Sequence, residues 1–292
     1  MLAILKIAAY VLGHIPLFIV NPAGRMLGAV AFAIDKKRRD IAIKNLNNAY
    51  RQEMPGHDAR QIAKKAFQNL AVTALEFTRL PWLKKGSIDD YVECIGTKAL
   101  DEALHGKRGA ILLTAHYGNW ELLVATLGLK GYSMDVVARE MDSRLFEGFV
   151  KWARTRCGNT IISKQRAMRR LLKSLSDGRI VVILLDQNVT WSEGVFVDFF
   201  GIPACTNKGL ALLQQGSKAP VVPAFIERSG KTHRLVVQDA VEFSSTGNRE
   251  KDTLINTQRC TKIIEDIVRK DPAQWFWVHR RWKTRPRTDA TV

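Results

Sequence analysis

The chain has 292 residues, and its 45 Lys and Arg against 28 Asp and Glu give a formal net charge of +17. Hydrophobic residues make up 46% of the sequence, which is enough for a folded core and excludes a wholly disordered chain. The positive charge indicates an anionic partner: nucleic acid, an anionic membrane surface, or a phosphorylated or acidic ligand. The positions of the charges along the chain have to decide between these partners.

Residues 1–34 are the most apolar part of the chain, and residues 2–20 have only Lys6 and His14 as polar interruptions. A basic run at 35–39 follows them. This order is typical of the cytoplasmic side of a membrane anchor. One span across the bilayer is interrupted by Pro16, so two short helices lying in the interface fit the pattern equally well. A buried helical hairpin is the third alternative. We expect the segment 1–34 to anchor the protein to a membrane.

From residue 35 onward the pattern changes twice. Apolar periodicity predicts helices over 36–80, within a helical part that spans 35–90. Beyond it, strands alternate with helices. The predicted strands cover 91–95, 109–115, 134–138, 160–162, 179–185, 220–226 and 234–241, and the predicted helices cover 97–105, 119–129, 143–157, 166–176, 206–216 and 250–270. The alternation predicts an α/β domain over 91–292, with a mixed, mostly parallel sheet flanked by helices.

The four cysteines stand far apart, at positions 94, 157, 205 and 260. They form no CxxC pair and have no neighbouring His at ligand spacing. The sequence therefore predicts reduced thiols, with neither a disulfide framework nor a metal site.

The predicted strand 109–115 ends at His116, and Glu121 follows in the first turn of the next helix. Ligands of such folds bind beyond the carboxyl ends of strands. Gly118 permits a sharp turn that can bring the Glu121 carboxylate onto an imidazole nitrogen, giving a base with an orienting partner. The alternative is structural, with the histidine capping the turn and the glutamate facing the helix dipole.

A second buried strand, 179–185, ends at Asp186. Gln187 and Asn188 come next, so three polar residues stand at another strand end. They form either part of the same site or a plain turn.

Basic residues gather at 154–156, at 164–173 and at 280–287. The cluster at 164–173 is typical of a solvated helix face. The last cluster follows the aromatic segment 274–279, and this combination suits a membrane headgroup zone or single-stranded nucleic acid. No RNP, helix-turn-helix or zinc-finger pattern supports nucleic acid, so we expect no nucleic-acid partner.

The residues 116–121, His-Tyr-Gly-Asn-Trp-Glu, resemble the HX4(D/E) signature of lipid acyltransferases. The segments 194–201, 220–223 and 274–283 resemble later blocks of the same family. Taken in order, these blocks resemble the bacterial lipid A late acyltransferases of the lauroyl/myristoyl transferase type. The resemblance covers nearly the whole chain, and it implies a fold like that of glycerol-3-phosphate acyltransferase.

The resemblance implies transfer of a fatty acyl chain to a hydroxyl of a membrane glycolipid, with a lipid A precursor as the expected acceptor. The donor would be an acyl thioester on acyl carrier protein or, as an alternative, on coenzyme A, and no cofactor or metal is needed. His116 would be the general base and Glu121 its partner. The expected location is the cytoplasmic face of the bacterial inner membrane, with acyl carrier protein and the anionic membrane surface as partners.

The resemblance also implies roles around this pair. Arg154 would stabilise the oxyanion or bind a substrate phosphate, and Asp186 would hold that arginine. Asn119 would fix the turn, and Arg169 is a further candidate for substrate binding. Two alternatives remain: an acyltransferase for another membrane lipid, and a non-enzymatic basic protein that binds membranes or nucleic acid.

Overall fold

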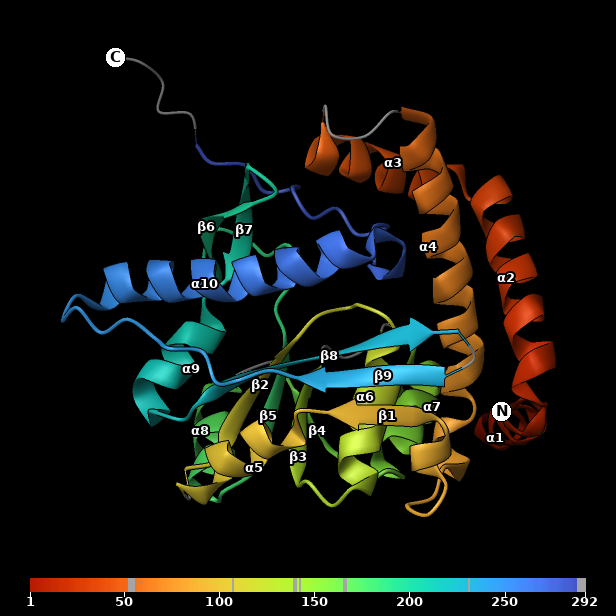
Figure 1. Ribbon diagram of the computed structural model, residues 1–292, viewed down its shortest axis with the longest axis horizontal. Coiled ribbons are helices and arrows are strands. Elements are labelled where there is room, and N and C mark those ends of the chain that lie inside the picture. Colours follow the sequence, from red (N-terminus) through yellow and green to blue (C-terminus); the bar gives the residue numbers. More distant parts are fainter. Residues whose placement is uncertain are drawn as a thin grey trace.

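The computed structural model describes residues 1–51, 56–106, 108–138, 141, 143–164, 167–230 and 232–287, without the side chains of residues 56 and 57. Four helices precede an α/β body (Figure 1). The helices are α1 (Leu2–His14), α2 (Leu17–Ile34), α3 (Lys36–Tyr50), α4 (Gly56–Phe77), α5 (Thr97–His105), α6 (Trp120–Leu129), α7 (Arg144–Thr155), α8 (Met168–Ser176), α9 (Gly209–Ser217) and α10 (Arg249–Lys270). The strands are β1 (Val92–Ile95), β2 (Ala110–Thr114), β3 (Met134–Ala138), β4 (Thr160–Ser163), β5 (Ile180–Leu184), β6 (Gly194–Phe199), β7 (Ile202–Asn207), β8 (Val221–Ser229) and β9 (Thr232–Val237).

The main sheet of the described chain has the strand order β1-β9-β8-β2-β5-β3-β4. Neighbours from β8 to β4 are parallel, whereas β9 runs antiparallel to β8 and β1 runs parallel to β9. The predicted α/β fold with a mixed, mostly parallel sheet is therefore confirmed.

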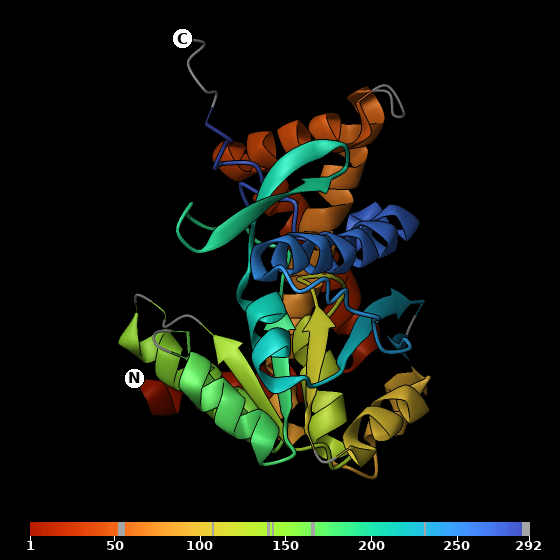
Figure 2. The same ribbon diagram turned by 90° about the vertical axis from the view of Figure 1, so that its left-hand side faces the viewer.

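A separate antiparallel hairpin, β6 and β7, was not predicted as strands. Figure 2 shows it standing apart from the main sheet, near α10. Because residues up to Asn207 belong to β7, helix α9 begins at Gly209 and not at the predicted residue 206.

Strand β2 is buried along its whole length and contributes to two cores. Ile111 and Leu113 pack in the cluster that contains Ile264 of α10. Leu112 packs on the other face, in the cluster that contains Leu123 of α6. Side chains of a strand alternate between faces, so an apolar run without polar interruptions requires helices on both sides of the sheet.

Helix α2 packs on α4 through residues four positions apart, namely Val20, Gly24, Gly28 and Phe32. A side chain at Gly24 would come within 2.7 Å of Val72, and one at Gly28 would collide with the backbone of Gln68 on α4. The glycines therefore let the two helix backbones approach closely. This packing uses one stripe of α2 and leaves its other faces open, so the segment 1–34 is not a buried hairpin.

By length and composition, α2 is the one helix among the described residues that passes for a membrane span. Core helices of soluble proteins and signal sequences have the same length and composition, but a core helix is mostly buried, whereas only 22% of α2 is buried.

We predict that Gly28→Val destabilises the protein by about 1–3 kcal/mol, because the added carbons must push α2 away from α4. The matched control is Leu27→Val on the exposed face of the same turn, which should stay within about 0.5 kcal/mol of the parent. Thermal unfolding in detergent measures both. Equal melting temperatures for the two variants would contradict the close packing.

Candidate active site

The site begins with two neighbouring strands that end side by side. Strands β2 and β5 are parallel and pair Thr114 with Leu184. Two residues beyond each partner stand His116 and Asp186. The His116 backbone N–H donates to Oδ2 of Asp186 at 2.9 Å, and Nδ1 of the ring lies 2.8 Å from Oδ1. The strand register thus brings an imidazole and a carboxylate together.

The Asp186 carboxylate is almost completely buried, at 3% exposure. Trp275 donates its indole N–H to Oδ2 at 2.8 Å. Burial alone raises the pKa of Asp186, but the charge of His116, its two hydrogen bonds and that of Trp275 outweigh this effect and lower the pKa to about 2. An ionised Asp186 accepts the Nδ1 proton of His116, which leaves Nε2 with a free lone pair.

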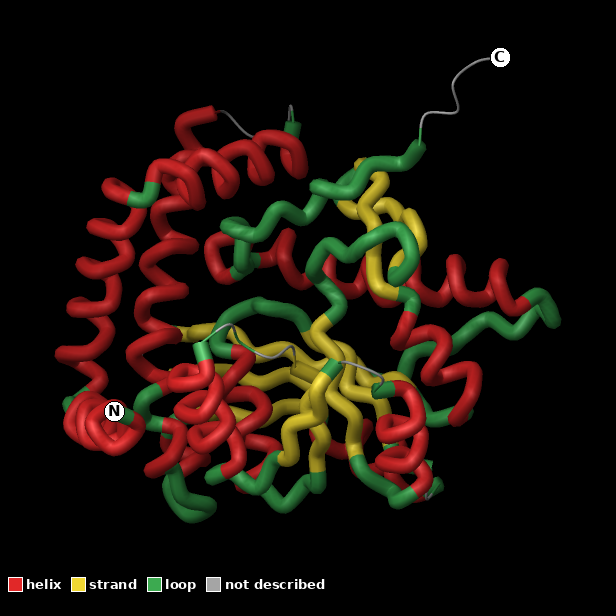
Figure 3. Tube along the Cα trace, turned by 180° about the vertical axis from the view of Figure 1, so that it is seen from behind, coloured by secondary structure: helices red, strands yellow, loops and turns green. Residues whose placement is uncertain are grey.

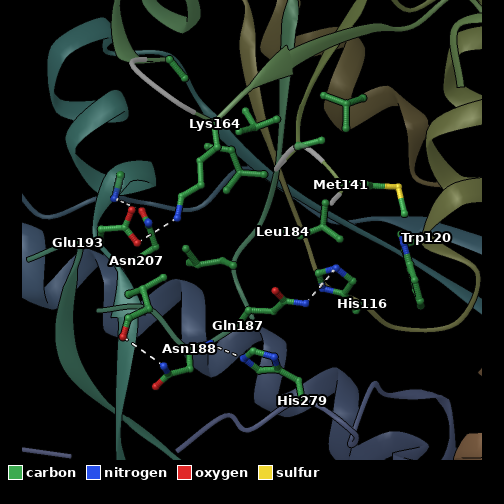
Figure 4. A pocket seen from close by; sticks show the side chains of 18 of the residues that line it. His116, Trp120, Met141, Lys164, Leu184, Gln187, Asn188, Glu193, Asn207 and His279 are labelled. Atoms are coloured by element: carbon green, nitrogen blue, oxygen red, sulfur yellow. Dashed lines mark hydrogen bonds and ion pairs between the residues drawn. The ribbon is translucent and has the colours of Figure 1, made fainter. Parts of the chain in front are cut away.

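The Nε2 side of His116 faces a large cavity, as Figure 4 shows. The Gln187 side-chain nitrogen lies 3.4 Å from Nε2. The rings of Trp120 and Phe276 flank the imidazole, with centroids 5.1 and 5.7 Å from it. Nε2 is therefore the ring nitrogen of His116 that a ligand in the cavity can reach, in place of the Gln187 amide.

The cavity has a volume of about 1510 Å³ and lies over the carboxyl ends of the strands. Much of its wall is apolar, with Val136 of β3, Ile161 of β4, Leu184 of β5 and Leu171 of α8 as examples. A hydrocarbon chain gains free energy when it is transferred from water to such a wall.

Cations also line this cavity. Lys37 of α3, Lys151 of α7 and the C-terminal Arg280 and Lys283 are exposed, and their side chains make no hydrogen bond or ion pair with another described residue. Unpaired cations of this kind are available to phosphate or carboxylate groups of a ligand. The cavity thus combines an apolar wall with an anion-binding rim.

Glu121 does not take the place that the sequence predicted for it. Its carboxylate accepts from Nε and Nη2 of Arg154 at 2.9 and 2.6 Å, and from the Trp120 indole at 3.2 Å. The Nδ1 partner of His116 is Asp186, so the predicted His116–Glu121 pairing is wrong. The first turn of α6 directs Glu121 toward α7, whereas the register of β2 and β5 places Asp186 beside the imidazole.

The predicted role of Asp186 as the partner of Arg154 is wrong for the same reason. The two pairings are the reverse of those predicted: Asp186 contacts His116, and Glu121 forms the ion pair with Arg154. Both Arg154 and Glu121 line the cavity, so this ion pair belongs to the site.

Asn119 fixes the turn, as predicted, and it does so from a fully buried position that does not line the cavity. Its Oδ1 caps α6 by accepting from the Leu122 N–H at 3.0 Å, and its Nδ2 donates to Glu76 of α4 at 2.8 Å. Glu76 also accepts two hydrogen bonds from Arg228 of β8, at 2.6 and 2.8 Å. A buried ion pair thus supports the turn that carries His116.

Burial alone raises the pKa of Glu76, but its hydrogen bonds with Arg228, the charge of Arg228 and the His233 ring 3.5 Å away outweigh this effect and lower the pKa to about 2. Its carboxylate is therefore ionised at neutral pH. Neither Glu76 nor Arg228 was singled out from the sequence, because the pair joins residues 152 positions apart.

Arg169 is exposed on α8 and does not line the cavity. The same helix contributes Met168 and Leu171 instead. Arg169 therefore has no place inside the site, and Arg166 of the same basic cluster lies outside the described residues.

The aromatic C-terminal segment closes over the catalytic turn. The Gly118 N–H donates to the Gln274 carbonyl at 2.9 Å, and the Phe276 N–H donates to the His116 carbonyl at 3.1 Å. Trp275, Trp277 and Trp282 are at most 4% exposed. The interpretation of the aromatic segment 274–279 as part of a headgroup zone is therefore wrong for Trp275 and Trp277. The signal that was missed is the alternating Trp275-Phe276-Trp277 pattern of a segment buried on one side.

The four cysteines are free, in agreement with the predicted reduced thiols. Within the described part of the chain, no three His, Cys, Asp or Glu side chains are grouped to hold a metal ion.

Comparison with known proteins adds a family to this geometry. The family model for bacterial lipid A biosynthesis acyltransferases matches residues 2–284. The lipid A biosynthesis lauroyltransferase of Escherichia coli (strain K12) is 27% identical over 94% of this chain and 88% of its own length. The palmitoleoyltransferase of the same organism is also 27% identical, over 90% and 84%, and its myristoyltransferase is 23% identical, over 91% and 81%.

We predict that Glu76→Gln destabilises the protein by about 3–5 kcal/mol, because it leaves the buried Arg228 without its counter-charge. The control is Glu93→Gln, which removes an exposed ion pair with Arg234 and should cost about 0–1 kcal/mol. Chemical unfolding compares the two.

The pH dependence of the free energy of unfolding gives a second test of the Glu76→Gln variant. Since folding lowers the pKa of Glu76 from 4.5 to about 2, its contribution is complete above pH 4.5 and is lost as the pH falls toward 2. Glu76→Gln should therefore lose less stability over this range than the parent. Equal costs for both variants at neutral pH would show that the buried pair does not support the fold.

Proposed function

The chain belongs to the family of bacterial lipid A biosynthesis acyltransferases, and on this basis we propose that it transfers a fatty acyl chain from acyl carrier protein to a hydroxyl of a lipid A precursor. The observation that carries the proposal is the His116–Asp186 pair, which faces a cavity with an apolar wall and a cationic rim. No cofactor is needed, because the thioester is already activated and a side chain supplies the base.

The proposed reaction starts at Nε2 of His116. This nitrogen takes the proton of the acceptor hydroxyl as the oxygen attacks the thioester carbonyl carbon. The tetrahedral intermediate then breaks its C–S bond, and the imidazolium returns the proton to the leaving thiolate. The products are the ester and the free thiol of the carrier. Asp186 stabilises the imidazolium that exists between the two proton transfers.

Two side chains are candidates to stabilise the oxyanion of that intermediate. One N–H of the Gln187 side-chain amide donates to Nε2 at 3.4 Å, which leaves the second N–H for an oxyanion that forms beside this nitrogen. Arg154 is the second candidate, because Glu121 engages its Nε and Nη2 and leaves Nη1 for a substrate. Glu121 is then a positioning residue for Arg154.

The two chemical parts of the cavity match the two parts of the substrates. The apolar wall of β3, β4, β5 and α8 would take the acyl chain, and Lys37, Arg280 and Lys283 would take phosphate groups of the glycolipid. A thioester on a cytosolic carrier requires the site to face the cytoplasm, so we place the enzyme on that face of the bacterial inner membrane.

Acyl carrier protein is acidic, so a basic surface beside the cavity would favour it over a small thioester. Arg169 and Arg170 are exposed on α8, next to Met168, which lines the cavity. We assign Arg169 to carrier docking and not to the interior of the site.

We predict that His116→Gln lowers kcat by about 10²–10⁴-fold, because the general base is lost. Asp186→Asn should lower kcat as well and move the acidic limb of the kcat/KM profile to lower pH, since the imidazolium loses its stabilising carboxylate. Glu121→Gln should lower activity without moving that limb. Assays with the purified protein, an acyl-carrier-protein thioester and a lipid A precursor measure all three variants.

The matched control is His105→Gln, on an exposed ring at the end of α5, which should keep full activity. Near-normal transfer by His116→Gln would overturn the assignment of the base. A shift of the acidic limb in Glu121→Gln and none in Asp186→Asn would assign the partner role to Glu121 after all.

For the donor, we predict that kcat/KM for the acyl-carrier-protein thioester exceeds that for the coenzyme A thioester by about tenfold or more at low salt, and that the excess shrinks as ionic strength rises. Arg169→Glu should lower the first value and leave the second nearly unchanged. Lys98→Glu, an exposed charge reversal on α5, is the control. Equal values for both donors at every salt concentration would show that no carrier surface exists.

A further inference from the structure

The two N-terminal helices present a large apolar surface that no other described part of the protein covers. On α1, Ile4 and Ile7 are 68% and 65% exposed, and on α2, Phe18, Met26 and Ile34 are 74%, 64% and 76% exposed. The side chains on these faces are too large and too many to be left in water at no cost. An exposed apolar surface of this size is typical of a binding surface for a partner or a membrane.

The arrangement of the two helices limits what that partner can be. In Figure 1, α2 runs upright along one edge of the molecule, while α1 is seen end-on at the lower end of the same edge. Figure 3 shows the same relation from behind. The two helix axes therefore run in different directions along the same edge of the protein. Two helices arranged in this way cannot both run along the bilayer normal, but both can lie in the plane of one membrane surface.

Helix α2 is also prevented from entering a bilayer alone. Its Phe32 ring packs against Phe67 of α4 at 5.5 Å between centroids, and Arg60 of α4 stands 5.4 Å over the same ring. Helix α4 is in turn fixed to the catalytic body by the buried Glu76–Arg228 pair. A span by α2 would therefore take the charged side of α4 into the hydrocarbon, which is costly.

The charges on the surface favour an anionic lipid headgroup layer. Residues 1–34 contain no Asp or Glu. Arg25 is exposed in the middle of α2, next to the exposed Met26, so a charge would stand near the centre of the bilayer if this helix crossed it. At the surface, the same side chain reaches the headgroups while its neighbours enter the acyl region. Exposed Lys36 and Lys37 follow at the end of α2.

From these observations we propose that α1 and α2 bind flat in one leaflet of an anionic bilayer, so that the protein is anchored without any segment crossing the membrane. The apolar faces of both helices enter the headgroup and upper acyl region, and α4 and the sheet stay on the cytoplasmic side.

This placement has a consequence for the cavity. Helix α1 packs against α7, which supplies Val150 and Arg154 to the cavity wall, and α3 follows directly after α2 and supplies Lys37. Both ends of the membrane-binding surface therefore adjoin the cavity. A lipid held in the same leaflet reaches His116 by lateral movement and does not have to pass through water.

The test measures depth along α2. Single nitroxide labels at Ile19→Cys, Met26→Cys and Ala33→Cys, which are exposed and lie seven residues apart on one face of α2, are introduced into the full chain with Cys94→Ser, since the other three native thiols are buried. The protein is reconstituted into vesicles of phosphatidylethanolamine and phosphatidylglycerol without substrate. Power saturation with oxygen and with a water-soluble nickel chelate then gives the depth of each label.

A flat α2 places all three labels at nearly the same shallow depth, about 5–10 Å into the interface. A spanning α2 would separate the labels at 19 and 33 by about 21 Å along the normal and put the label at 26 far deeper than the other two, near the bilayer centre, which would overturn the proposal. Labels shielded from both relaxing agents would overturn it differently, by showing that a second copy of the chain covers the face. A label at the exposed Leu254 of α10 is the control and should be reached by the nickel chelate.

Discussion

The pairing of His116 with Asp186 is the interaction on which the rest of the site depends. It exists because β2 and β5 are parallel, adjacent and in register, so the residues that follow their ends meet. The carboxylate is buried, and a buried charge is tolerated only when its hydrogen bonds are satisfied. The His116 backbone, its ring and the Trp275 indole supply those bonds. The pairing of β2 with β5 in the sheet thus determines the orientation of the His116 imidazole.

Distant parts of the chain keep this pair in place. The C-terminal segment brings Trp275 and binds the His116 carbonyl through Phe276. On the other side, Asn119 ties the catalytic turn to Glu76 of α4, the helix on which α2 packs. Helix α2 and His116 are therefore connected through α4 and its buried Glu76 carboxylate. Under the two proposals above, this connection fixes the membrane-binding surface relative to the active site.

The sequence predicted the sheet and the strand ends well, because buried parallel strands are uninterrupted apolar runs and polar residues follow them, as at His116 and Asp186. It could not predict which carboxylate meets the imidazole, since this depends on strand register and on the direction of the first turn of α6. It also placed Trp275 at an interface, because aromatic residues beside basic ones have the same local pattern whether they are buried or exposed. The β6–β7 hairpin was missed for a related reason, since short strands with a mixed pattern carry little local signal.

The most direct test of the account is the tautomer of His116, observed by ¹⁵N NMR of histidine-labelled protein in detergent, with the resonance assigned by its loss in His116→Gln. The account predicts that the neutral ring carries its proton on Nδ1, with an N–H resonance shifted downfield by the hydrogen bond to Asp186. That signal should disappear in Asp186→Asn and persist in Glu121→Gln. A neutral ring protonated on Nε2 in the parent protein would contradict the central claim.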